Sequence, residues 1–237
     1  GVAESYTVSD DGLVYTFHLR PTARWSNGEP VTAKDFFWSW RRMLHPETGS
    51  QYAYQLYYVV GAEAYNMSVV NVGDRVEVEL DNRKNPQQLF PRGTILCGIL
   101  TRVDQAAENF SVEVKSEKEG QVDWDGEGQL QHFTKVTAEQ PGDGERCHHL
   151  LPDFESTVGI LVEDAATLVV TLNNRTPYFT DLVAFYPLYP VNQACVEEHG
   201  TPNWTKPGKI INNGPFLLEF RRIRDRVRMS RNPRYWN

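Results

Sequence analysis

The chain has 237 residues, a length that fits one large domain or two modest ones. Its 24 basic and 31 acidic side chains leave a net charge of −7, which argues against a protein that binds nucleic acid along its whole length. Hydrophobic residues make up 40% and aromatic residues 12%, so the composition is far from that of disordered chains. The sequence predicts a folded globular protein, and its 14 prolines and 17 glycines predict many turns.

Membrane and redox signals are sparse in the sequence. No run of about 18 apolar residues is present to span a bilayer. The residues that follow Gly1 lack the basic start and the apolar run of a signal peptide, so we expect no signal peptide here. The cysteines Cys97, Cys147 and Cys195 are widely spaced, which predicts no disulfide framework. Three buried thiols are the favoured interpretation, and one disulfide pair is the alternative.

The first 46 residues predict a hairpin followed by a helix. Residues 9–12 (Ser-Asp-Asp-Gly) are typical of a tight turn that follows a short strand. Apolar residues then alternate along 13–20, which predicts a second strand with one apolar face. Thr32 has the character of a helix cap, and an apolar stripe at i, i+4, i+7 and i+8 from Phe36 predicts a helix that stops at Pro46.

Two predicted helical segments carry more aromatic residues than one apolar stripe of each could hold. The predicted helix carries four aromatic residues between Phe36 and Trp40. Residues 52–58, which we expect to begin another helix, carry four tyrosines. Core packing is the favoured explanation for each ring taken singly, yet some rings must pack on a second layer or face a cleft. A pocket that accepts varied side chains is the functional interpretation.

Residues 67–156 differ in character from the rest of the chain. Short alternating strands are predicted at 73–80, 94–101, 110–115 and 130–136, between glycine, proline and asparagine breaks. This acidic block holds 17 acidic and 9 basic side chains, a net charge of −8, and the chain total of −7 leaves +1 for the rest. The spacing indicates a small antiparallel sheet or SH3-like barrel inserted into another domain.

Beyond the acidic block, the sequence predicts a strand at 167–172, a short helix after Pro177, an extended connection at 185–190 and a hairpin from 214 to 229. Seven arginines occupy the end of the chain, at Arg221, Arg222, Arg224, Arg226, Arg228, Arg231 and Arg234. Alternation across a hairpin would divide them between two faces, so a solvated edge is favoured. A salt-sensitive patch that binds anions or docks a lobe is the alternative.

No enzymatic motif is present in the sequence. It has no Gly-rich phosphate loop, no His-Glu-x-x-His, no Cys-x-x-Cys and no Gly-x-Ser-x-Gly. Cys147-His148-His149 is the nearest metal candidate, but neighbours on a strand point to opposite faces and no second cluster completes four ligands. A solvated loop is favoured there, and a metal enzyme is the weakest alternative. We predict no catalytic residue, no metal and no cofactor.

Ordered motifs stand on both sides of the acidic block. Before it lie Ala3-Glu4-Ser5, Ser9 to Arg20, Trp25 to Phe36, Ser39 to Arg42, His45-Pro46 and Tyr52-Ala53. After it lie Thr167 to Leu172, Pro177 to Phe179, Tyr189 to Val191, Trp204 to Pro207, Asn213 to Phe216 and Asn232 to Trp236. Their order resembles that of the family 5 solute-binding proteins, the peptide-binding subunits of bacterial ABC importers, and above all the oligopeptide-binding branch. The resemblance covers 1–66 and 157–237.

The resemblance implies an α+β chain that is part of a two-lobe periplasmic-binding-protein-like fold (class II, cluster C). It places 1–66 and 157–190 in the accessory lobe of the peptide binders and 191–237 in a segment of the ligand-binding lobe. Family members are more than twice this length, so we expect a partial chain without the opposing carboxyl-terminal lobe. The family has a short linker where the acidic block stands, so we expect residues 67–156 to be an inserted β domain.

The functional implication is capture of an oligopeptide between two closing lobes and its delivery to an ABC transporter permease, without catalysis. Tyr52 matches a tyrosine that lines the cleft for peptide side chains. Asn213 and Gly214 lie at a turn near the lobe junction, where structural support explains them as well as ligand contact does. We expect a monomer in the periplasm or anchored outside the cytoplasmic membrane, with no membrane span and no nucleic-acid partner. The alternative is a protein-interaction module that acts through the acidic block.

Overall fold

The structure of the chain is a computed structural model. It describes residues 1–80, 95–104, 109–114, 129–134 and 148–236. The chain divides into two compact units, of which one combines 1–62 with 159–237 and the other consists of 63–158. The first unit is therefore built from both ends of the sequence, and the second from the stretch between them.

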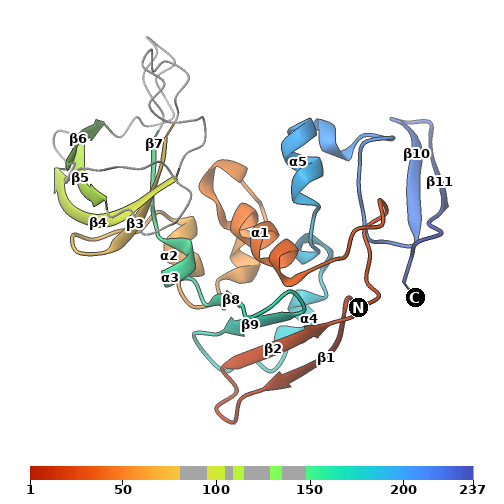
Figure 1. Cartoon of the computed structure of the whole chain (residues 1–237), viewed down its shortest axis with the longest axis horizontal. Coiled ribbons are helices and arrows are strands. Elements are labelled where there is room, and N and C mark those ends of the chain that lie inside the picture. The colour runs from red at the N-terminus through yellow and green to blue at the C-terminus, as the bar shows by residue number, and fades with distance from the viewer. Residues whose placement is uncertain (81–94, 105–108, 115–128, 135–147, 237) are drawn as a thin grey trace. The chain divides into compact units, whose positions relative to one another are not determined.

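A four-stranded antiparallel sheet in the order β1-β2-β9-β8 organises the first unit (Figure 1). Its strands are β1 (Ala3–Val8), β2 (Val14–Leu19), β8 (Ile160–Val162) and β9 (Thr167–Thr171). In the central pair, Tyr15 of β2 lies opposite Val170 of β9, and Phe17 lies opposite Leu168. Strands from before and after the acidic block therefore share one sheet.

The first hairpin forms as its sequence predicts. Burial alternates along β2, with Tyr15 and Phe17 buried between partly exposed neighbours, because successive side chains of a strand point to opposite faces. Gly12 occupies the turn with φ = 72°, and a Cβ there would lie 2.6 Å from the Nε of Arg175. Arg175 donates hydrogen bonds to the Asp11 carbonyl at 3.1 Å and to the Asp10 carbonyl at 3.0 Å. A residue from beyond the acidic block thus fixes the turn.

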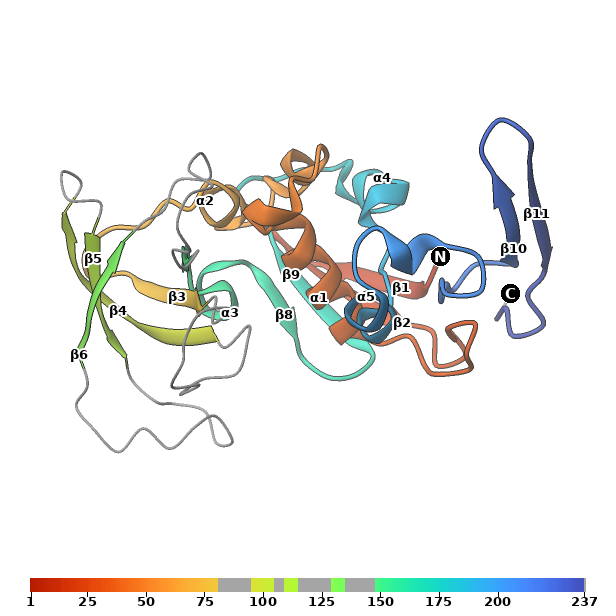
Figure 2. The same cartoon turned by 90° about the horizontal axis from the view of Figure 1, so that it is seen from above.

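Helix α1 (Ala33–Leu44) covers one face of this sheet and contacts β8 and β9 (Figures 1 and 2). At its start, the Asp35 carboxylate accepts hydrogen bonds from the Thr32 amide at 2.7 Å and the Thr32 hydroxyl at 3.0 Å. These bonds hold the first turn, as expected of a capping pair. Trp40 lies on the buried stripe, and its Nε1 donates a hydrogen bond to the Leu188 carbonyl at 2.9 Å.

Two segments of the first unit differ from their sequence predictions. Residues 52–58 were expected to begin a helix, but only the short 3₁₀ helix η2 (Ala53–Leu56) forms. The buried residues at its two ends, Ala53 and Leu56, lie three positions apart, which matches the three residues per turn of a 3₁₀ helix. The connection 185–190 was expected to be extended, yet it contains the 3₁₀ helix η3 (Tyr186–Leu188), since Pro187 needs no amide partner in a first turn.

The remaining elements of the first unit are short. They are η1 (Pro46–Thr48), α4 (Phe179–Val183), α5 (Gln193–His199), η4 (Asn203–Thr205), β10 (Phe216–Arg222) and β11 (Arg226–Arg231). Helix α4 and the β10–β11 hairpin agree with the sequence predictions, whereas α5 was not predicted. The Asn192 side chain caps α5 by accepting a hydrogen bond from the Cys195 amide at 2.9 Å. All seven arginines near the end of the chain are exposed, as the solvated interpretation requires.

A five-stranded antiparallel sheet in the order β6-β5-β4-β3-β7 forms the second unit. Its elements are α2 (Ala62–Asn66), β3 (Arg75–Leu80), β4 (Ile95–Asp104), β5 (Asn109–Val114), β6 (Gln129–Thr134), β7 (His148–Pro152) and α3 (Phe154–Thr157). Strands β3 to β6 correspond to the four predicted strands, and β7 was not predicted. The antiparallel sheet is observed, whereas an SH3-like barrel stays a prediction.

Buried polar groups in the second unit have partners. The Tyr65 ring packs edge to face on Phe154 with centroids 4.8 Å apart, and its hydroxyl donates to Glu77 Oε1 at 2.8 Å. Glu77 is only 5% exposed, so this bond offsets part of the cost of removing a carboxylate from water. Arg75 Nε lies 2.7 Å from the Asp153 carboxylate and ties β3 to the start of α3.

The cysteines agree only in part with the interpretation of three buried thiols. Cys195 is buried in α5, where its Sγ lies 3.2 Å from the Lys209 carbonyl oxygen. Cys97 is partly buried in β4, and Cys147 lies outside the described residues. Complete burial is therefore confirmed for Cys195.

Truncation of Leu168 tests the shared sheet. Leu168 is 2% exposed on β9, opposite Phe17 of β2. Leu168→Ala should lower the free energy of unfolding by about 2 to 5 kcal/mol, because it removes buried methyl groups and leaves a cavity. The matched control is Leu161→Ala on β8, where the side chain is 60% exposed and the cost should stay within about 0.5 kcal/mol. Urea unfolding measures both, and equal losses would contradict the sheet arrangement.

Candidate functional site

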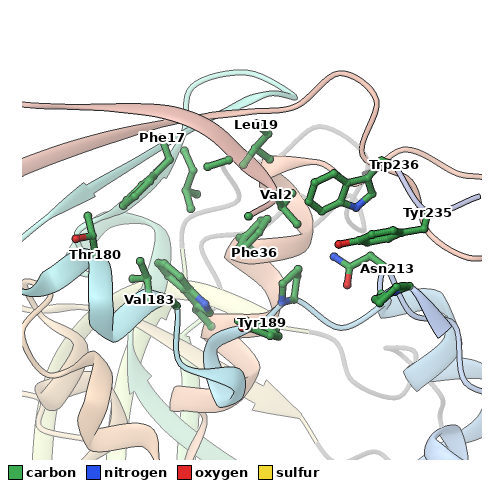
Figure 3. Close-up of a pocket in the computed structure, with 18 residues that line it drawn as sticks. Val2, Phe17, Leu19, Phe36, Thr180, Val183, Tyr189, Asn213, Tyr235 and Trp236 are labelled. Carbon is green, nitrogen blue, oxygen red and sulfur yellow. The ribbon is translucent and has the colours of Figure 1, made fainter.

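An apolar cavity of about 530 Å³ lies in the first unit. Figure 3 shows side chains that reach it from several elements. Strand β2 supplies Phe17 and Leu19, and α1 supplies Phe36 and Trp40. Aromatic and aliphatic walls of this kind hold apolar groups and exclude water. The cavity therefore lies against the apolar stripe of α1 and the buried face of β2.

The opposite wall comes from the last part of the chain. Asn213, Gly214, Tyr235 and Trp236 line it. Asn232, only 2% exposed, braces this wall, because its Nδ2 donates to the Gly214 carbonyl at 2.8 Å and its Oδ1 accepts from the Arg234 amide at 3.0 Å. Residues 213–214 and 235–236 are thus fixed relative to each other by one side chain.

Trp236 brings an unused hydrogen-bond donor to the cavity wall. Its Nε1 is buried and has no hydrogen-bond partner among the described residues. The ring packs against the buried cluster of Ala23, Trp25 and Val31, and the Arg20 guanidinium lies 5.5 Å from its centroid. A buried donor without an acceptor costs about 1 to 3 kcal/mol. The apolar packing of the ring must therefore offset this cost.

Tyr52 lies in the same unit but does not line this cavity. Its ring contacts Phe185 edge to face with centroids 5.5 Å apart, and Tyr186 with centroids 6.3 Å apart. Phe185 and Tyr186 contact each other at 4.8 Å. Each of these three rings, which we call the aromatic triad, therefore touches the other two.

Hydrogen bonding within the aromatic triad affects the ionisation of Tyr52. The side-chain hydrogen bond with Tyr186 raises the pKa of the Tyr52 phenol above its ordinary value, and the charge interaction with Tyr186 acts in the same direction. A phenol already ionises only near pH 10. The Tyr52 hydroxyl therefore stays protonated at neutral pH, and the aromatic triad presents rings and hydroxyl groups.

The three residues singled out from the sequence fall in two places. Asn213 and Gly214 come together in the cavity wall, and Tyr52 stands apart in the aromatic triad. Sequence reasoning did not select Trp236 or the Phe185-Tyr186 pair as site residues. The aromatic pairs Tyr235-Trp236 and Phe185-Tyr186 were visible signals, but nothing in the sequence shows which ring faces a cavity.

Metal chemistry has no support among the residues that the structure describes. In that part of the chain, no group of three or more His, Cys, Asp and Glu side chains is placed to hold an ion. Cys147 lies outside the described residues, and the side chains of His148 and His149 are likewise outside the description.

Replacement of Asn232 tests the bracing of the cavity wall. Asn232→Ala leaves the Gly214 carbonyl and the Arg234 amide without their partner and should lower the free energy of unfolding by about 1 to 3 kcal/mol. Tryptophan fluorescence should shift to the red as Trp236 becomes more hydrated. Asn174→Ala, at an exposed asparagine, is the control and should change neither quantity. An unchanged Asn232→Ala protein would show that the wall does not depend on this side chain.

Comparison with known proteins agrees with this architecture. Oligopeptide-binding protein OppA of Bacillus subtilis is 28% identical over 237 residues, which is 100% of this chain and 28% of that protein. The structure of an oligopeptide ABC transporter substrate-binding domain from Bacillus anthracis is 27% identical with a TM-score of 0.59, covering 100% of this chain and 30% of that one. Haemophilus influenzae OppA in complex with the peptide RPPGFSPFR is 25% identical with a TM-score of 0.59, again covering 100% and 30%.

The chain thus spans 28% of the length of the curated relative and 30% of the two solved chains. Its mixed helix and sheet fold matches that of periplasmic solute-binding proteins of the OppA type. The family model of the bacterial extracellular solute-binding proteins, family 5 (middle region), matches residues 1–237. Since this match covers the whole chain, the protein belongs to the family 5 bacterial extracellular solute-binding proteins.

Proposed function

We propose that residues 1–237 are part of the substrate-binding subunit of an ABC transporter, which captures oligopeptides and delivers them to a membrane permease. The observation that carries this proposal is the family match over the whole chain, together with relatives that are named oligopeptide-binding proteins. The pairing of β2 with β9 supports it, because both flanks of the acidic block then form one scaffold. No specific observation favours an interaction module that acts through the acidic block.

In this proposal, residues 1–237 make up only part of the subunit. Residues 1–66 and 157–190 would form the accessory lobe, 191–237 a segment of the ligand-binding lobe, and 67–156 an inserted β domain, which would be SH3-like if its sheet closes into a barrel. A second lobe would come from the remainder of the subunit. An extended peptide held between two lobes gains affinity from backbone hydrogen bonds and specificity from side-chain pockets.

Within this scheme the three selected residues have different roles. Tyr52 lines the cleft that receives peptide side chains, and its partly exposed ring in the aromatic triad supports this role. Both backbone polar groups of Gly214 are hydrogen-bonded, because its amide donates to Asn212 Oδ1 at 2.9 Å and its carbonyl accepts from Asn232. These bonds favour structural support at the turn formed by Asn213 and Gly214.

The proposed transport role predicts where the subunit is located and that it performs no catalysis. Family members are solute-binding proteins rather than enzymes, and we assign no catalytic step to this chain. In the part of the chain that the structure describes, no helix has both the length and the apolar character needed to cross a membrane. We propose a monomer located in the periplasm or anchored outside the cytoplasmic membrane, which meets the permease when peptide is bound.

Peptide titration by calorimetry tests the proposed function. The full-length subunit that carries residues 1–237 should bind mixed tripeptides to pentapeptides. Residues 1–237 alone should bind the same peptides weakly or not at all, because half of the closing surface is missing. Free amino acids of the same composition are the control and should give no binding to either protein.

Two results would contradict this proposal in different ways. Failure of the full-length subunit to bind any peptide in the mixture would overturn the oligopeptide role. Micromolar binding by residues 1–237 alone would instead overturn the need for a second lobe, and would leave the peptide specificity in place.

A further inference from the structure

We propose that the aromatic triad is a side-chain subsite that selects peptides carrying an aromatic residue, with Tyr186 as the residue that positions Tyr52. This inference rests on the proposed peptide-binding function and extends it to a ligand class. It assigns roles to Phe185 and Tyr186, which the sequence predicts to lie in an extended connection.

The arrangement of the three rings carries the inference. Tyr52 meets Phe185 at an interplanar angle of 81° and Tyr186 at 69°, and Phe185 meets Tyr186 at 64°. Each contact is thus close to edge to face, which is the favoured geometry for pairs of aromatic rings. Tyr186 is 64% exposed, and the other two rings are partly exposed. The aromatic triad therefore presents ring surface to solvent even though its members are mutually packed.

The backbone beneath the aromatic triad is anchored on both sides. Leu188, at the end of η3, is buried, and its carbonyl accepts the Trp40 Nε1 hydrogen bond from α1. Next to Tyr52, the side chains of Ala53 and Leu56 are buried in η2. Exposure of the rings therefore does not result from a loose segment. A surface that is fixed before a ligand arrives loses less conformational entropy on binding.

The chemistry of the aromatic triad favours an aromatic guest over an acidic one. Its rings offer apolar area and polarised edges, and the Tyr52 hydroxyl is engaged with Tyr186 and stays protonated at neutral pH. A phenylalanine side chain would add a further edge-to-face contact, worth about 3- to 10-fold in affinity beyond simple burial. A cationic side chain over a ring face is the competing possibility. It is therefore included as an outcome of the test.

A second tyrosine pair in the same unit provides a matched control. Tyr58 and Tyr178 also meet edge to face, with centroids 5.9 Å apart at 87°, and their hydroxyl oxygens lie 3.4 Å apart. Tyr178 is 50% exposed, and its pKa is also raised by the hydrogen bond with its partner. Among the described residues, this pair has no third ring in contact. Tyr178→Ala therefore removes a similar exposed phenol without touching the aromatic triad.

The experiment measures peptide preference in the full-length subunit. Alanine pentapeptides that carry one phenylalanine, at each position in turn, are titrated against pentaalanine and against the same set with lysine. The best phenylalanine peptide should bind more tightly than pentaalanine by at least about 3- to 10-fold, the gain expected from the ring contact alone. Tyr186→Ala should abolish this preference, Tyr186→Phe should keep most of it because the ring remains, and Tyr178→Ala should leave it unchanged. Circular dichroism confirms that each variant is folded.

A spectroscopic titration gives a readout of positioning that is independent of peptide binding. The part of the tyrosinate signal that disappears in Tyr52→Phe belongs to Tyr52. In Tyr186→Phe, the midpoint of that part should move to lower pH, because the hydrogen bond that raises the Tyr52 pKa is lost. An unmoved midpoint would contradict the positioning role of Tyr186.

Each remaining outcome has a definite meaning. A phenylalanine preference that survives Tyr186→Ala, or that falls equally in Tyr178→Ala, overturns the subsite. Tighter binding of the lysine peptides overturns the aromatic preference. If peptides bind with no preference at all, the subsite fails and the oligopeptide role stands. If no peptide binds, the oligopeptide role fails and the subsite fails with it.

Discussion

The pairing of β2 with β9 is the constraint on which the first unit depends. Phe17 and Leu168 lie opposite each other although the whole second unit separates them in sequence. The entropic cost of closing a loop grows only with the logarithm of its length, about 0.6 kcal/mol for each doubling. A long insertion between two paired strands is therefore tolerated, provided that the strands keep their register. The acidic block can fold as a separate sheet without disturbing the scaffold on either side.

Helix α1 connects this sheet to the apolar cavity and to the aromatic triad of the first unit. Phe36 projects into the apolar cavity, and Trp40 hydrogen-bonds the Leu188 carbonyl beneath the aromatic triad. Ser39 adds a second tie, because its hydroxyl accepts a hydrogen bond from the Val191 amide at 2.9 Å. One helix thus sets the position of the segment that carries Phe185 and Tyr186. Phe36 and Trp40, one turn apart on the same stripe, thus serve both the cavity and the aromatic triad.

Local sequence signals were sufficient to predict those elements whose apolar residues repeat regularly within the element itself. Alternation along 13–20 predicted β2, and the capped apolar stripe predicted α1, because burial on one side repeats with the period of each element. The signals failed where neighbours decide the conformation. Residues 52–58 and 185–190 form only 3₁₀ turns, where η2 packs against α1 and the Leu188 carbonyl is held by Trp40 of α1. Strands β7 and β8, of five and three residues, are likewise defined by the strands they pair with.

The sequence by itself determined the family, the order of the main elements and the absence of known catalytic motifs, since these depend on residue types in a fixed order. It also selected Tyr52, Asn213 and Gly214 as residues of interest. Only the tertiary structure decided that Asn213 and Gly214 share a cavity wall with Trp236 while Tyr52 packs with Phe185 and Tyr186. The physical reason is that the cavity joins β2 and α1 to residues 213–236, and the aromatic triad joins Tyr52 to Phe185 and Tyr186. These segments lie more than a hundred residues apart, and their approach is set by strand register and buried packing rather than by any local pattern.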